Sequence, residues 1–143
     1  MRTPSARTLL APVAVAAVMA CLTVRSPLLA HHAFAAEFDV NKPLKLQGTL
    51  KQWEMINPHS WFHVDVKGPD GTVVTWMIEG GSPNQLIRMG VTKNTVAIGT
   101  MLIVEAYQAK DGSNRAVGRN LTLTDGTRLF LGGSAPGSGG DAK

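Results

Sequence analysis

The chain is poor in cysteine and, in its expected mature form, nearly free of net charge. Its single cysteine, Cys21, lies in an apolar N-terminal segment that we expect to be removed. A fold cross-linked by disulfides is therefore excluded, and the domain must be stabilised by its core. A length of 143 residues is enough for one domain and short for two.

Residues 1–30 predict an export signal. Arg2 and Arg7 precede an apolar run, residues 9–24, which is too short for a comfortable membrane span and is followed at once by Arg25 and Pro27. We therefore expect no transmembrane segment in the mature chain, and a periplasmic or secreted location.

The signal has three candidate cleavage points. We favour cleavage after Ala30, which makes His31 the mature N-terminus. Cleavage after Ala35 fits the small-x-small pattern but lies far from the apolar run. The residues before Cys21 only loosely resemble a lipoprotein box, so a lipid anchor on Cys21 is not expected.

Removal of the signal also changes the charge. Three of the 14 cationic residues leave with it and all 10 acidic residues stay, so the net charge falls from +4 to +1. This near-neutral balance removes the electrostatic support for a nucleic-acid partner. An unknown small ligand or a periplasmic protein is the expected partner.

The remaining sequence is divided into an arm, a β-rich domain and a tail. Residues 31–43 form the arm, in which Phe34 and Phe38 suit one helical turn or two aromatic anchors. Strands are expected over residues 44–53, 59–66, 73–79, 101–107, 116–123 and 127–131. Residues 82–90 predict a short helix with Ser82 as N-cap. Residues 132–143 are rich in Gly and Ser and predict a disordered tail.

Three strands, a helix and further strands are the element order of an OB-fold, so residues 44–131 predict a small five- to six-stranded Greek-key barrel of all-β class. A β-sandwich with an inserted helix is the alternative. In an OB-fold, strands two and three and the neighbouring loops form the usual binding face.

The second strand carries the strongest functional pattern. Ser60, Phe62, Val64 and Val66 alternate on a core-like face, so the opposite face presents His59, Trp61, His63 and Asp65. With Asn57 in the preceding turn and Glu79 at the end of the third strand, these outward residues form the predicted ligand-binding face.

Several motifs together resemble a family of small exported bacterial proteins, an uncharacterised domain of unknown function. They are His31-His32-Ala33-Phe34, Trp53-Glu54 leading to Asn57-Pro58-His59, Glu79-Gly80-Gly81-Ser82-Pro83-Asn84 and Ala109-Lys110-Asp111-Gly112-Ser113. The resemblance covers residues 31–131. It implies export and a compact β-rich domain, but no activity and no catalytic residues.

The histidines suggest copper as a possible ligand of this chain. If His31 is the mature N-terminus, its amine and imidazole could chelate Cu(II), with His63 or His59 as a further nitrogen ligand. His59 and His63 lie about 13 Å apart on a straight strand, so they cannot share one ion. The alternative is that His59 only stabilises the Asn-Pro turn and His63 only covers a half-exposed strand. In that case we expect no cofactor.

A catalytic site is not indicated. His59 and Ser60 are adjacent on a strand and point to opposite faces, so they cannot form a nucleophile and base pair. Asp65 could orient His63 or approach Glu79, but both carboxylates also suit a solvated sheet surface. We interpret the chain as a non-catalytic exported binding or accessory module, with a copper-binding protein as the alternative.

Overall fold

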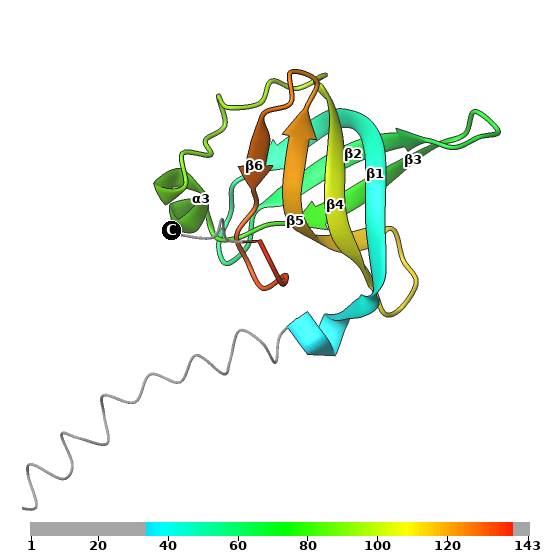
Figure 1. The fold of residues 1–143 in the computed structure, drawn as a ribbon, viewed down its shortest axis with the longest axis horizontal. Helices are drawn as coiled ribbons and strands as arrows, with labels where there is room; N and C mark the ends of the chain where they lie inside the picture. The colour runs from blue at the N-terminus through cyan, green and yellow to red at the C-terminus, as the bar shows by residue number, and fades with distance from the viewer. Residues whose placement is uncertain (1–33, 139–143) are drawn as a thin grey trace, which may run out of the picture.

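Between residues 34 and 138, six strands and the short helix α3 follow one another in the order that the sequence predicts (Figure 1). The computed structural model describes residues 34–138. Within this range no helix has the length and hydropathy to span a bilayer. The elements are β1 (Phe38–Glu54), β2 (Trp61–Lys67), β3 (Val73–Glu79), α3 (Pro83–Arg88), β4 (Met101–Ala109), β5 (Arg115–Leu123) and β6 (Arg128–Phe130), with a helical turn at residues 34–37 before β1.

The sheet closes on itself. Its strand order is β3-β2-β1-β4-β5-β6, and β3 also pairs with β5 in parallel, with Ile78 opposite Ala116. The other pairings are antiparallel, and the β2–β3 hairpin projects beyond the sheet (Figure 1). This closure, with the helix between β3 and β4, confirms the predicted OB-fold-like barrel. The sandwich alternative is not formed, because one sheet contains all six strands.

The first strand is longer than expected. It starts at Phe38, so residues 38–43 of the predicted arm are part of the sheet. A register shift between Phe38 and Pro43 accommodates the proline against β4. Further along, a Cβ on Gly48 would lie 2.5 Å from the carbonyl oxygen of Asp65. The missing side chain therefore lets β1 approach β2 closely, while the register shift with β2 falls between Leu50 and Gln52.

The barrel interior is filled by buried apolar side chains from β1 to β5 and by Leu86 of the helix, and Leu129 of β6 packs against them. Helix α3 forms where predicted, with the Ser82 Oγ accepting from the Gln85 N–H and Pro83 in the first turn. The fully buried members of this core include Leu50, Phe62, Val64, Ile78, Leu86, Leu102, Val104 and Leu121. A second apolar cluster, Phe34, Phe38, Ala109, Val117 and Ala135, joins both ends of the described chain to β4 and β5.

The chain also stays on the domain beyond the last predicted strand. Residues 132–138, which the sequence places in a disordered tail, lie against the barrel, and Ala135 and Ser138 are buried. The Gly81 N–H donates to the Leu131 carbonyl at 2.7 Å, and the Gly133 N–H donates to the Gln85 side chain. These contacts give the Gly-rich segment fixed backbone partners, which composition alone does not reveal.

Candidate functional site

Strand β2 has the two faces that its sequence predicts. Ser60, Phe62 and Val64 are buried, while Trp61, His63 and Asp65 are half-buried on the outer side. Their neighbours across β3 are known from the register: Trp61 lies opposite Glu79 and Asp65 opposite Thr75. Polar outer-face groups of β2 are therefore distributed along the strand rather than gathered at one point.

A buried carboxylate lies at one end of this face. Glu79, at the end of β3, is 4% exposed, and its Oε1 lies 3.0 Å from Nδ1 of His59. Burial raises the pKa of Glu79 above its ordinary value, an effect that His59 and Arg115 oppose and the Glu37 carboxylate reinforces. The His59 side chain remains 42% exposed. An imidazole is thus held by a buried acid while part of it faces solvent.

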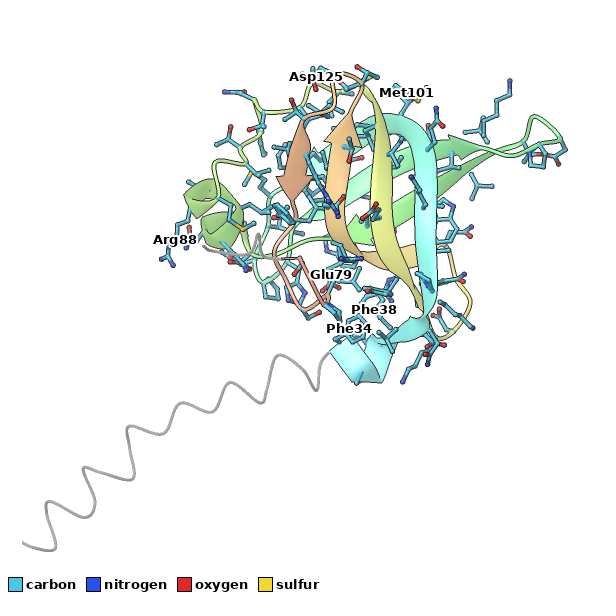
Figure 2. The ribbon with its side chains drawn as sticks, in the orientation of Figure 1. Phe34, Phe38, Glu79, Arg88, Met101 and Asp125 are labelled. Atoms are coloured by element: carbon cyan, nitrogen blue, oxygen red, sulfur yellow. The ribbon has the colours of Figure 1, made fainter. Side chains whose placement is uncertain are left out.

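An aromatic ring and a guanidinium extend this pair. The guanidinium carbon of Arg115, at the start of β5, lies 5.5 Å from the ring centre of Trp61. Arg115 also forms an ion pair with Glu37 at 3.4 Å. We define the β2–β3 site as His59, Trp61, Glu79 and Arg115. Figure 2 shows Glu79 at the end of the barrel where Phe34 and Phe38 pack.

The other predicted residues lie in separate contacts. His63 Nε2 is enclosed and lies 3.3 Å from the Glu54 carboxylate, while Asp65 accepts from Thr75 and faces Lys51 at 3.5 Å. Asn57 is exposed in the turn before β2. Asp65 lies opposite Thr75, whereas Glu79 lies opposite Trp61 at the other end of the β2–β3 pairing. The two carboxylates therefore do not approach each other, which the sequence had suggested.

The predicted metal ligands are only partly within the described residues. His31 lies outside them. Between residues 34 and 138, no group of three or more His, Cys, Asp or Glu side chains is arranged to hold a metal ion. His59 lies beside Glu79 and His63 beside Glu54, so the two histidines have different carboxylate partners.

The aromatic residues also divide between core and surface. Trp53 is buried and stacks on Phe62 with ring centres 4.7 Å apart, and Trp76 packs against the same core. Only Trp61 of the three tryptophans belongs to the β2–β3 site, so no extended aromatic platform is formed.

The Glu-Gly-Gly-Ser-Pro-Asn motif serves both the site and the fold. A Cβ on Gly80 would lie 2.8 Å from the Phe62 ring, and one on Gly81 would lie 2.8 Å from the Gly133 backbone nitrogen. The two glycines therefore allow the chain to pass between the core and the C-terminal segment directly after Glu79. Ser82 then caps α3. The motif's other polar residues, Glu79 and Asn84, have no structural requirement of this kind, and only Glu79 is buried.

Comparison with known families gives a match over residues 17–119 to a family of unknown function, DUF6152. The chain belongs to this family. The family's description assigns no activity, and the match extends from the predicted signal into β5. The comparison with curated proteins found no match.

Among solved structures, the chain is similar to a mitochondrial single-stranded DNA-binding protein from S. cerevisiae, Rim1. The identity is 16% and the TM-score 0.46, over 61% of this chain and 94% of the other.

Two members of the site region were not predicted from the sequence. Arg115 and Glu37 reach Trp61 and Glu79 only because β5 pairs with β3 and the turn at residues 34–37 folds back onto β5. A local pattern contains neither pairing. The one available signal was the Phe34 and Phe38 spacing, which predicted that the arm would be anchored.

Proposed function

We propose that this protein is an exported, non-catalytic binding module whose ligand contacts the β2–β3 site. The observation that supports this proposal is the burial of Glu79 beside a half-exposed imidazole. Burying a carboxylate costs free energy, and a raised pKa means that its partners do not fully offset this cost. Groups kept in such an environment are characteristic of functional sites.

The site offers groups suited to recognition. His59 and Glu79 supply a polar pair, and Trp61 with Arg115 supplies a flat surface and a cation. We propose no catalytic step, because the hydroxyl of Ser60, the residue next to His59 in the sequence, is enclosed on the core side of β2. The proposal also contains no nucleic acid, given the near-neutral charge of the mature chain. Export is proposed on the pattern of residues 1–30.

The test is the pH dependence of stability. The Glu79 pKa is raised above 4.5, so the folded protein holds this proton more tightly than the unfolded chain does. The free energy of unfolding should therefore fall as pH rises from about 4.5 through the raised pKa. Glu79→Gln removes this loss, so we expect the variant to be more stable than the wild type at pH 7. Urea denaturation between pH 4 and 8 measures both effects.

Glu105→Gln is the matched control. A hydrogen bond from Asn120 lowers the pKa of Glu105, so its contribution to stability is present above pH 4.5 and lost as pH falls. This variant should be less stable than the wild type at pH 7. If Glu79→Gln also lost stability at pH 7, Glu79 would be a structural ion-pair partner and the proposal would lose its support.

The copper-binding alternative has its own supporting observation. Nδ1 of His59 lies 3.0 Å from the Glu79 carboxylate, and no ion pair of Nε2 is found within residues 34–138, so Nε2 is left for another partner. Metal-binding histidines are commonly oriented by a carboxylate in this way. His31 lies three residues before Phe34, a reach of about 11 Å at most, and Phe34 packs near this end of the barrel. This favours His59 over His63 as the partner of His31.

A further inference from the structure

A pocket separate from the β2–β3 site is formed by residues of β1, β4 and β5. It has a volume of about 360 Å³ and is lined by Pro43, Leu44, Lys45, Glu105, Ala106, Tyr107 and Arg119. We call it the Arg119 pocket. It shares no residue with the β2–β3 site, and the buried Val117, which lies opposite both Glu79 and Tyr107, separates the two.

Arg119 is brought to this pocket by a β-bulge. In the pairing of β4 with β5, Glu105 lies opposite Asn120 and Ala106 opposite Gly118, so Arg119 is the extra residue without a partner in the register. Bulges redirect a side chain and are frequent beside binding sites. The Arg119 carbonyl still accepts from the Leu131 N–H at 3.0 Å, which fixes the bulge against the segment after β6.

The guanidinium of Arg119 is held but unpaired. Its Nε is enclosed and has no hydrogen-bond acceptor in the described part of the chain, and no carboxylate there lies within 4.0 Å of it. Gly137 packs directly on it, since a Cβ at Gly137 would lie 2.8 Å from Nη2. A planar donor group fixed in this way has lost much of its side-chain entropy before a ligand arrives.

The acidic residue of the pocket does not satisfy this cation. The Oε2 atom of Glu105 already accepts from Asn120 at 2.9 Å and from Arg128 at 3.0 Å. Lys45, opposite Glu105 on β1, also has no ion-pair partner between residues 34 and 138. Among the described residues, the pocket lining therefore contains two cations, Lys45 and Arg119, and one carboxylate, which is a positive excess of one.

We propose that the Arg119 pocket binds the oxyanion of a small organic molecule, a carboxylate or a phosphate ester, through the guanidinium of Arg119. Arginine pairs with both groups through its planar set of N–H donors. Lys45 adds a second positive charge at the mouth. The apolar lining from Leu44, Ala106 and Tyr107 suits a carbon body, and the volume matches the lower end of small-molecule sites.

The test uses the full mature chain and two probes with the same ring, benzoate and phenyl phosphate, titrated by calorimetry and amide NMR. We expect one-to-one binding in the millimolar range or tighter by at least one probe, with shifts centred on β1, β4 and β5. Binding of benzoate alone assigns a carboxylate ligand, and binding of phenyl phosphate alone assigns a phosphate ester. Arg119→Gln should weaken binding by at least about 10-fold.

Two further variants keep the result interpretable. Lys45→Gln changes an exposed residue, should fold normally and should weaken binding by a smaller factor, so it reports on the pocket even if Arg119→Gln unfolds. Arg88→Gln, on exposed α3, removes the same charge elsewhere and should leave binding unchanged. The proposal is overturned if the folded wild type binds neither probe at about 10 mM. It is also overturned if Lys45→Gln and Arg88→Gln weaken probe binding equally.

Discussion

Phe62→Ala is expected to lower the free energy of unfolding by about 3–5 kcal/mol. Phe62 is 1% exposed, stacks on Trp53 and touches the position where Gly80 lacks a side chain. Its removal leaves a cavity in the centre of the barrel that rigid strands on all sides cannot close. Denaturant unfolding followed by tryptophan fluorescence measures the loss, and Phe62→Leu, a milder change, serves if the alanine variant does not fold.

Trp61→Ala is the control for this prediction, because Trp61 is the next residue on the same strand and lies on the outer face. It should cost about 1 kcal/mol, mainly from the lost contact with Arg115. Equal losses from the two variants would mean that both faces of β2 are packed in a core. The β2–β3 site could not then be a binding surface.

His59→Gln is expected to weaken Cu(II) binding by at least about 10-fold if the copper-binding alternative holds. The imidazole of His59 would be a direct ligand beside the mature N-terminus, and Gln cannot replace its nitrogen. Glu79→Gln should weaken binding by about 10- to 100-fold, because it removes the group that orients the imidazole. The protein must be produced by export, and intact mass should show that it starts at His31.

His63→Gln is the matched control, since His63 is enclosed against Glu54 and lies on another row of the hairpin. Its copper affinity should equal that of the wild type. A mature chain that starts at Ala36, or the absence of binding at micromolar copper, would exclude the alternative and leave the binding-module proposal standing.

Local patterns were sufficient to predict most of the fold. The alternation in β2 identified Phe62 and Val64 as core residues, and Ser82 with Pro83 located the start of α3. The element order then predicted the closed sheet. The predictions for β2 and α3 were correct because each depends on residues within one strand or one helical turn.

The parts that local patterns could not predict depend on contacts between distant segments. Residues 132–138 resemble a flexible tail in composition, but Ala135 packs in the second apolar cluster, and Gly81 and Gly118 leave room for the chain near Leu131 and Gly133. Arg119 likewise shows its role only through the bulge and the close approach of Gly137. Strand spacing predicts that His59 and His63 lie apart, but the Glu79 partner of His59 depends on the register of β2 with β3.

The proposed function depends on Glu79 being a buried carboxylate kept beside His59 for binding, and the titration of its side-chain carboxyl is the decisive measurement. Carbon-detected NMR can follow the Glu79 and Glu105 carboxyl carbons in one sample from acid to neutral pH. We expect a Glu79 midpoint above 4.5 and a Glu105 midpoint below it. A Glu79 midpoint at or below 4.5 would show a solvated or well-paired carboxylate, and Glu79 would then give no support to a binding site.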